Sequence, residues 1–153
     1  MTVTRLLGPG DAPVLGELLR RNRAFLASWQ PLRTERYYTD EGQQEAVGKA
    51  LRQHESGSSL PLVIVGRRDA VVGAMTLQSL IRGSFQSCSV GYWLAEDAQG
   101  QGLATAALRE AVHIAFRDFH LHRVQAETLP DNPRSQRVLE RVGFVSTAWR
   151  SRT

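Results

Sequence analysis

The residues best suited to chemistry lie in a short glycine-containing turn that joins an apolar strand to an amphipathic helix. The first backbone N–H groups of a helix have no partner within the helix and lie at the positive end of its dipole. Glycines let an anion approach those groups without a Cβ in the way. The turn therefore predicts a phosphate or diphosphate site, with a plain strand-to-helix connection as the alternative. The candidate residues are Gln99, Gly100, Gln101, Gly102, Leu103, Ala104 and Thr105.

Two common nucleotide-binding motifs do not fit this turn. A dinucleotide fingerprint would place Gly or Ala three residues after Gly102, where this chain has Thr105, which argues against a nucleotide-binding regulatory domain. A P-loop would end in Gly-Lys-Ser/Thr, which the turn lacks. The turn does match Gln/Arg-x-x-Gly-x-Gly/Ala, filled by Gln99, Gly102 and Ala104 directly after a Gly-Tyr-Trp-Leu strand. This pattern resembles the coenzyme A pyrophosphate loop of the GNAT superfamily of acyl-CoA-dependent N-acyltransferases.

A second stretch makes the resemblance more specific. It combines Asn-x-x-Ser, at Asn132 and Ser135, with a Val-Leu-Glu helix that stops at Gly143-Phe144, where glycine suits the left-handed end of a helix. At this distance behind the turn, the pattern resembles the ribosomal-protein N-terminal-alanine acetyltransferase (RimJ/RimL-like) branch. The resemblance implies one N-acetyltransferase domain over residues 1–153 that uses acetyl-CoA, with no metal. Its acceptor would be a primary amine, on a peptide or protein N-terminus or on a small molecule.

The resemblance also implies roles for individual residues in acyl transfer, which needs a neutral amine, a donor for the oxyanion and a proton for the leaving thiolate. N–H groups near Tyr92, Trp93 and Leu94 would hold the pantetheine arm and the thioester carbonyl. Asn132 would hydrogen-bond the pantetheine arm, and it would also serve as a helix N-cap. Ser135 would donate the proton to the thiolate; otherwise it is a solvent-facing residue of the first helical turn.

The general base and the acceptor site are less defined by the sequence. Glu127 is the preferred carboxylate because its strand faces the cofactor in the superfamily, with Glu35 and Asp40 as other candidates; each is alternatively a plain surface charge, and solvent can take the proton. Phe25 and Trp29 lie in a segment that resembles the one bordering the family's acceptor site. Alternatively, Phe25 and Trp29 only close the hydrophobic core.

Composition bounds the class of protein. The 153 residues suit one domain, and no run of eighteen apolar residues is present to span a bilayer. The net charge of +4 comes almost wholly from arginine, but the arginines are scattered, which disfavours nucleic acid as a partner. The N-terminus lacks the apolar core of a signal peptide, and the single cysteine, Cys88, suits a reducing cytoplasm. His120 and His122 form a His-x-His pair without a nearby third ligand, so a metal site is not expected.

The predicted element order is β-α-α-β-β-β-α-β-α-β. The consecutive strands indicate a mixed sheet, and the resemblance implies a GNAT-type α+β fold with α/β/α layers, in which helices flank a mostly antiparallel sheet. We expect Asp11 and Thr39 to cap the first two helices and Gly91 to mark a bulge or a close backbone approach. Family members usually continue past Gly143-Phe144 with a longer hairpin. Here the last family strand is therefore expected to be missing, or to be supplied by a partner chain, or to be cut from this sequence. An open sheet edge would favour a homodimer, and a coenzyme A-binding module without turnover is the alternative function. The predicted strands cover 3–7, 60–66, 71–80, 87–94, 123–129 and 144–149, and the predicted helices cover 11–23, 39–54, 103–119 and 132–142.

Overall fold

A computed structural model describes residues 2–126 and 132–145 of the chain. The strands are β1 (Thr4–Leu6), β2 (Leu60–Val65), β3 (Val71–Ile81), β4 (Ser87–Leu94) and β5 (Arg123–Ala126). The α-helices are α1 (Ala12–Arg21), α2 (Arg23–Leu26), α3 (Asp40–Glu55), α4 (Leu103–His113) and α5 (Pro133–Val142). Short 3-10 turns cover Pro9–Asp11, Glu35–Tyr38, Arg67–Asp69 and Glu96–Ala98, and a π-helical turn, Ile114–Asp118, continues α4. Most predicted elements are therefore present, with α2 separated from α1.

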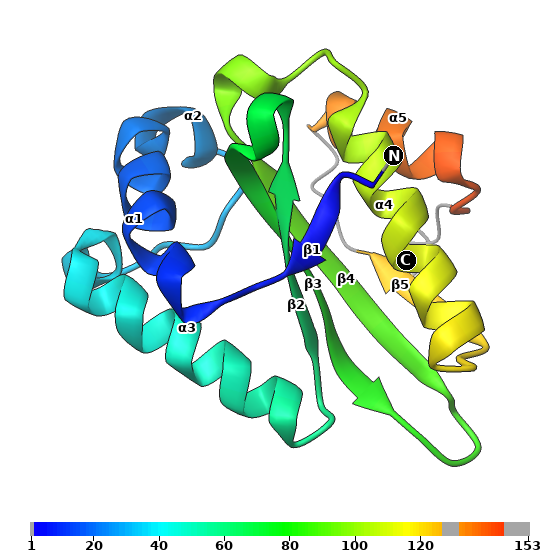
Figure 1. The fold of residues 1–153 in the computed structure, drawn as a ribbon. Coiled ribbons are helices and arrows are strands. Elements are labelled where there is room, and N and C mark those ends of the chain that lie inside the picture. The colour runs from blue at the N-terminus through cyan, green and yellow to red at the C-terminus, as the bar shows by residue number, and fades with distance from the viewer. Residues whose placement is uncertain (1, 127–131, 146–153) are drawn as a thin grey trace.

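The five strands form one sheet in the order β1-β2-β3-β4-β5. The first three pairings are antiparallel, and β4 pairs with β5 in parallel. Figure 1 shows α1 and α3 on one side of the sheet and α4 and α5 on the other. The predicted three-layer arrangement around a mixed, mostly antiparallel sheet is confirmed.

The sheet is apolar on both faces because each face is covered by helices. All six residues of β2 are buried, and successive side chains of a strand point to opposite faces. Leu62 and Ile64 pack with Leu108 of α4, whereas Val63 and Val65 pack against the α1 and α3 layer. This continuous apolar strand anchors both helical layers to the same sheet.

The predicted helix caps have different outcomes. Thr39 caps α3 as expected, since its Oγ1 accepts a hydrogen bond of 3.0 Å from Gly42 N–H. Asp11 does not cap α1 with its side chain, because its own backbone is already helical, with φ −83° and ψ −13°. Its carboxylate instead accepts two hydrogen bonds of 2.9 Å from the Arg5 guanidinium and one of 2.8 Å from Gly8 N–H. The Arg5 hydrogen bond is the main reason why the pKa of Asp11 is lowered.

The prediction of a bulge at Gly91 is wrong. The β3–β4 register runs without interruption from Gln78↔Ser89 to Gly73↔Leu94, and the irregularity lies between Gln78 and Ile81. The close backbone approach occurs at Gly73, where a Cβ would lie 2.3 Å from the Trp93 carbonyl oxygen. A Cβ on Gly91 would meet only the Gln78 side-chain nitrogen, at 3.7 Å.

Two predicted ends fall partly outside the described residues. The strand predicted for 123–129 is described only as β5, and most of the strand predicted for 144–149 lies beyond residue 145. The helix of α5 ends as expected, with Gly143 in the left-handed region at φ +107°. The described chain thus contains the strand-turn-helix unit of β4 and α4 and the helix α5, which carry most of the candidate site.

Candidate active site

A cavity of about 440 Å³ lies where β4 extends beyond its partner β5. In the described residues the β4–β5 pairing runs from Ser87↔Arg123 to Val90↔Ala126, while β4 stays paired with β3 as far as Leu94. Residues 91–94 therefore have one side that carries no described strand partner. The cavity is lined by Phe25, Leu26, Trp29, Gln30, Val90, Gly91, Tyr92, Trp93, Leu94, Gln99, Ala104, Ala126, Asn132, Pro133, Arg134, Ser135 and Val138.

The open side of β4 presents backbone groups to this cavity. Ala95 N–H donates to the Val72 carbonyl at 2.8 Å, which fixes the direction of that residue toward β3. Because alternate residues of a strand direct their N–H and C=O groups to opposite sides, Tyr92 and Leu94 direct theirs away from β3. The Leu94 carbonyl accepts a hydrogen bond of 3.0 Å from Gln99 Nε2, in agreement with this direction.

The glycine turn has the backbone geometry that an anion cradle requires. Gly100 and Gly102 both have φ +76°, a left-handed conformation that favours glycine, and a Cβ at either position would meet nothing within 4 Å. The bond from Ala106 N–H to the Gly102 carbonyl is 3.0 Å long, so the N–H groups of 103–105 precede the regular bonding of α4. The turn thus combines open space with helix N-terminal donors.

The remaining residues of the turn have supporting places. Gln101 Nε2 donates to the Asp97 carbonyl at 3.2 Å, while Leu103 packs on the main core and Thr105 is buried. Of the seven turn residues, Gln99 and Ala104 line the cavity, and Gly100, Gln101, Gly102, Leu103 and Thr105 do not. The predicted anion site therefore lies at the edge of the cavity, with its backbone donors at the start of α4.

A buried asparagine links the helices of the first half to this turn. Asn22 Nδ2 donates to the Leu18 carbonyl at 2.8 Å, and its Oδ1 accepts from Glu96 N–H at 2.8 Å. Asn22 thereby joins the end of α1 to the segment that leads into the turn. Sequence reasoning missed this role, although a polar residue between two apolar helical segments was the available signal.

Tyr92, Asn132 and Ser135 form a hydrogen-bonded group on one wall of the cavity. Tyr92 Oη lies 2.9 Å from Ser135 Oγ, and Asn132 Oδ1 accepts from Ser135 N–H at 3.2 Å, which makes Asn132 the N-cap of α5. Burial raises the pKa of the Tyr92 phenol, and the hydrogen bond to Ser135 acts in the opposite direction. The structure therefore brings a protonated phenol and a serine hydroxyl together in the cavity.

The opposite wall comes from α2 and the residues after it. Phe25 and Trp29, the predicted acceptor residues, both line the cavity together with Leu26 and Gln30. Leu26 is buried, and Trp29 is partly exposed. Sequence reasoning missed Leu26, Gln30, Pro133, Arg134 and Val138 as lining residues, because their positions depend on how α2 and α5 pack.

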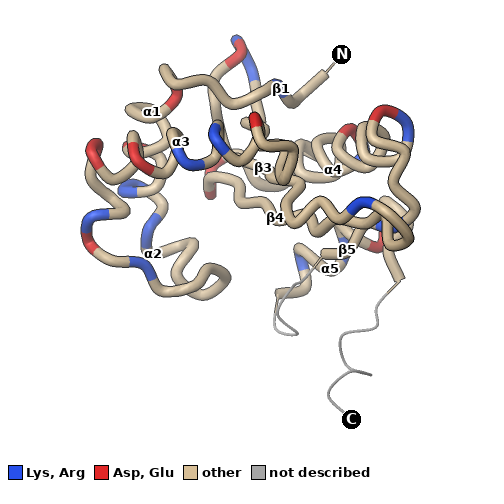
Figure 2. The backbone as a smooth tube through the Cα atoms, turned by 90° about the horizontal axis from the view of Figure 1, so that it is seen from below, with Lys and Arg blue, Asp and Glu red and all other residues tan. Residues whose placement is uncertain are grey.

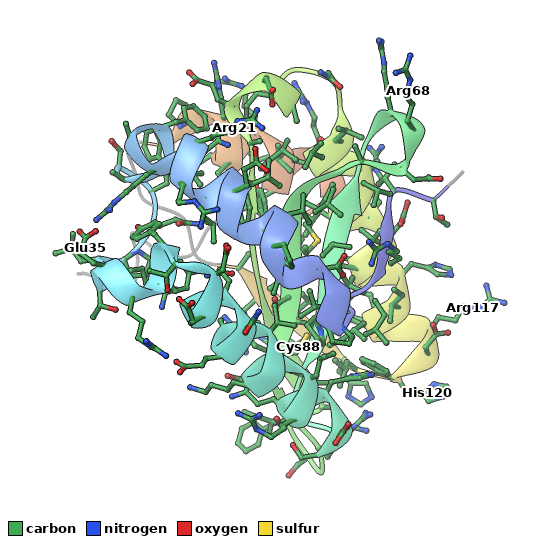
Figure 3. All side chains as sticks on the ribbon, turned by 60° about the vertical axis from the view of Figure 1, so that its left-hand side comes forward. Arg21, Glu35, Arg68, Cys88, Arg117 and His120 are labelled. Carbon is green, nitrogen blue, oxygen red and sulfur yellow. The ribbon has the colours of Figure 1, made fainter. Side chains whose placement is uncertain are left out.

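The structure does not support Glu35 or Asp40 as the general base. Both lie outside the cavity lining, and Figure 3 shows Glu35 at the outer edge of the molecule. Glu35 accepts hydrogen bonds of 2.9 and 2.7 Å from Arg23, which lower its pKa and make it a weaker base. Asp40 pairs with Arg20 at 3.2 Å. Basic and acidic residues are interspersed over α1, α3 and the segment that precedes α3 (Figure 2), which favours such pairs. Glu127 lies outside the described residues.

Several other features bear on the class of protein. Cys88 lies inside the molecule (Figure 3), and burial raises the pKa of its thiol to about 11. Within 2–126 and 132–145, no group of three or more His, Cys, Asp or Glu side chains is placed to hold a metal ion. None of the helices in this part of the chain has the length and apolar character needed to traverse a lipid bilayer.

Comparisons with known proteins agree with this arrangement. The family described as acetyltransferase (GNAT) domain matches residues 3–145. The ribosomal protein uS5-alanine N-acetyltransferase of Escherichia coli K12 is 34% identical over 148 residues, which cover 96% of this chain and 76% of the relative. The ribosomal-protein-S5-alanine acetyltransferase of Vibrio fischeri has a TM-score of 0.88 at 29% identity, over 93% of this chain and 78% of that one.

A third comparison concerns a structure solved with a ligand. RimJ of Mycobacterium smegmatis, in complex with CoA-disulfide, has a TM-score of 0.90 at 27% identity, over 95% of this chain and 70% of that one. The resemblance predicted from the glycine turn and the Asn-x-x-Ser helix is thus confirmed at the level of the family. The match spans nearly the whole chain, which belongs to the GNAT acetyltransferase family.

Proposed function

We propose that this protein transfers the acetyl group of acetyl-CoA to the α-amino group of a protein N-terminus, with a small-molecule amine as the other acceptor class. The names of the Escherichia coli and Vibrio fischeri relatives, which specify an alanine of a ribosomal protein, support the first acceptor. The coenzyme in the Mycobacterium smegmatis RimJ structure supports acetyl-CoA as the donor. One observation carries the proposal: a single cavity joins the glycine turn, the open side of β4 and the Ser135 hydroxyl.

The coenzyme fits the described residues at two places. The diphosphate would lie against the N–H groups of residues 100–105, where Gly100 and Gly102 leave space for it. The pantetheine arm would follow the open side of β4. It would accept a hydrogen bond from one of the backbone N–H groups of Tyr92 and Leu94, which leaves the other for the thioester carbonyl, and one from the Asn132 side-chain amide. Because the Oδ1 of Asn132 already accepts from Ser135 N–H, its Nδ2 group is the part that would serve the ligand.

The proposed reaction is a direct attack within a ternary complex. The neutral amine nitrogen attacks the thioester carbonyl carbon, and the N–H group of Tyr92 or Leu94 stabilises the oxyanion that develops. When the C–S bond breaks, the sulfur leaves with the electron pair and takes a proton from Ser135. The amine loses one proton to water, and water returns one proton to Ser135, so the reaction is balanced. In the described residues no carboxylate lines the cavity, so water accepts the amine proton in this scheme unless Glu127 does.

The acceptor amine would enter between Phe25 and Trp29. These side chains line the same cavity as residues 90–94 of β4, so an amine there would be close to the open strand. A predominantly apolar wall lowers the pKa of an ammonium group by desolvation and favours the neutral, nucleophilic amine. In this proposal Phe25 and Trp29 bind the acceptor, and their place in the cavity lining supports that role.

The test combines binding and turnover in one protein sample. Calorimetric titration with acetyl-CoA measures binding, and release of free thiol is then followed with peptides that carry a free or a blocked N-terminus and with small amines. Binding with thiol release for peptides with a free N-terminus, and not for blocked peptides, supports the protein N-terminus as acceptor, whereas release with small amines alone assigns the other acceptor class. Binding without release for any amine favours the alternative, a coenzyme A-binding module, and no binding contradicts both.

A further inference from the structure

We propose that the Tyr92 side chain is a positioning residue that aims the Ser135 hydroxyl hydrogen at the departing sulfur. The inference rests on the proposed acetyl transfer, in which Ser135 supplies a proton. Tyr92 is on β4 and Ser135 is in the first turn of α5, yet their oxygens lie 2.9 Å apart. The role concerns the phenol of Tyr92 and is separate from the backbone N–H of the same residue.

The direction of this hydrogen bond follows from the chemistry of the two hydroxyls. Each hydroxyl has one hydrogen and two acceptor lone pairs. A phenol is more acidic than an alcohol, so the Tyr92 O–H is the better donor and Ser135 Oγ the better acceptor. With Tyr92 donating, the single hydrogen of Ser135 remains available to a third atom in the cavity.

Both partners are held by the surrounding structure. The half-buried Tyr92 packs against the main core cluster, so its ring fixes the position of Oη. Burial raises the pKa of its phenol, which keeps the donor hydrogen in place at neutral pH. The Ser135 backbone is fixed by the 3.2 Å bond from its N–H to Asn132 Oδ1. The rotation of the Ser135 hydroxyl is then the remaining freedom, and Tyr92 restricts it.

The residues that line the cavity make Tyr92 and Ser135 the candidates for the proton donor. Tyr92 and Ser135 carry the hydroxyl groups among the described lining residues, which include no carboxylate, histidine or thiol. Without the Tyr92 hydroxyl, Ser135 would turn toward a backbone carbonyl of its own helix or toward solvent, as serines in helices often do. Its hydrogen would then be misaligned for the sulfur, and orientation contributes strongly to rate.

The kinetic test uses Tyr92→Phe, which removes one oxygen and keeps the ring. We expect kcat to fall about tenfold while KM for acetyl-CoA changes by less than about twofold, because the loss affects the transition state. Ser135→Ala should lower kcat at least as much, and the double variant should be no slower than Ser135→Ala. Tyr37→Phe, whose ring lies outside the cavity, is the matched control and should retain the wild-type kcat.

The possible outcomes separate this inference from the proposed function. A wild-type kcat in Tyr92→Phe overturns the positioning role. A double variant that is slower than Ser135→Ala by the full factor of Tyr92→Phe also overturns it. In both cases the proposed acetyl transfer itself stands. A fall in kcat/KM that arises only through a raised KM, with kcat unchanged, would assign Tyr92 to binding and would also overturn the positioning role. Absence of turnover in the wild-type protein would overturn the proposed function and this role with it.

A second measurement tests the contact without turnover. In carbon NMR of protein with ring-labelled tyrosine, the Tyr92 signal is assigned by its loss in Tyr92→Phe. At neutral pH we expect this signal to move in Ser135→Ala, because its hydrogen-bond partner is gone, while the signals of Tyr37 and Tyr38 stay in place. An unchanged Tyr92 signal would show that the hydrogen bond does not form in solution.

Discussion

Asn22 and Glu96, which are 74 residues apart, are joined by a hydrogen bond of 2.8 Å from the Glu96 N–H to the Asn22 side-chain oxygen. The same side chain donates to the Leu18 carbonyl, so one buried amide connects α1 with the segment before the anion-binding turn. The position of the turn therefore depends on a residue that does not line the cavity.

Replacing this amide should affect both stability and coenzyme binding. Asn22→Ala leaves Glu96 N–H and the Leu18 carbonyl without their partner, and we expect a loss of about 1–3 kcal/mol in the free energy of unfolding. Acetyl-CoA affinity should also fall, because the turn loses its tether. Urea denaturation and calorimetry measure the two effects. Asn22→Asp keeps an acceptor for Glu96 N–H and should retain more affinity than Asn22→Ala; equal losses in both variants would contradict the tether.

The anion cradle is tested by Gly102→Glu. A carboxylate at this position would occupy the place of the diphosphate, so acetyl-CoA affinity should fall by at least about a hundredfold. The left-handed φ of +76° costs a non-glycine residue about 1–2 kcal/mol, which the fold should tolerate. Gly57→Glu is the matched control, since Gly57 has φ +83° and equally open surroundings in the link before β2. Calorimetry that finds the same affinity in both variants would refute the site.

Substitution of Gly91 should change acetyl-CoA affinity without lowering thermal stability. A Cβ here would meet only the Gln78 amide, at 3.7 Å, and β-branched residues suit strands, so Gly91→Val should leave thermal stability unchanged or higher. It would also occupy part of the cavity and lower acetyl-CoA affinity by at least about tenfold. Gly73→Val has the opposite expectation, because its Cβ would lie 2.3 Å from the Trp93 carbonyl oxygen and would disrupt β3–β4 pairing. Thermal melts measure the stability of each variant, and binding titrations measure its acetyl-CoA affinity. A stable Gly91→Val variant with full affinity would contradict a coenzyme site at Gly91.

The pairing of Asp11 with Arg5 predicts a pH-dependent stability. The pKa of Asp11 is lowered in the folded protein, chiefly by the Arg5 hydrogen bond. The stabilisation of the fold by the ionised Asp11 carboxylate is complete above the carboxyl pKa of the unfolded chain, about 3.9. It disappears as the pH falls through the lower pKa of the folded protein. At neutral pH, Asp11→Asn should cost about 1 kcal/mol, a small figure because Arg5 is about half exposed and water screens the pair.

The measurement for this pair is the melting temperature of wild type and Asp11→Asn as a function of pH. The difference between the two proteins should be constant from pH 7 down to the unfolded carboxyl pKa and should narrow below it. Asp118→Asn, a change at an exposed residue after α4, serves as the control for a general charge effect. A difference that persists to the lowest pH would show that the Asp11 charge is not its source.

The parts of the structure that sequence predicted depend on neighbouring residues. Thr39 caps the helix that it immediately precedes, Gly143 ends the helix before it, and the glycine turn lies directly between its strand and its helix. These features follow from local backbone chemistry. The sheet with helices on both sides was predicted from the resemblance to the GNAT superfamily.

The parts that sequence did not predict depend on contacts between distant elements. Asp11 was expected to cap α1, but Arg5 from the neighbouring strand binds its carboxylate. The Tyr92–Ser135 pair spans 43 residues and forms only when α5 packs beside β4. Glu35 was a candidate for the general base, but its ion pair with Arg23 holds it at the outer edge of the molecule. Spacing along the chain contains no information about such contacts.

The most direct test of the proposed function is acetyl transfer to a peptide that begins with alanine. Purified protein is incubated with acetyl-CoA and this peptide, thiol release is followed, and the peptide is analysed by mass spectrometry with a peptide of blocked N-terminus as control. The account predicts one acetyl group on the α-amine, formed at the rate of thiol release and absent from the blocked peptide and from Gly102→Glu. Binding of acetyl-CoA without any acetylated amine, for peptides and small amines alike, would contradict it.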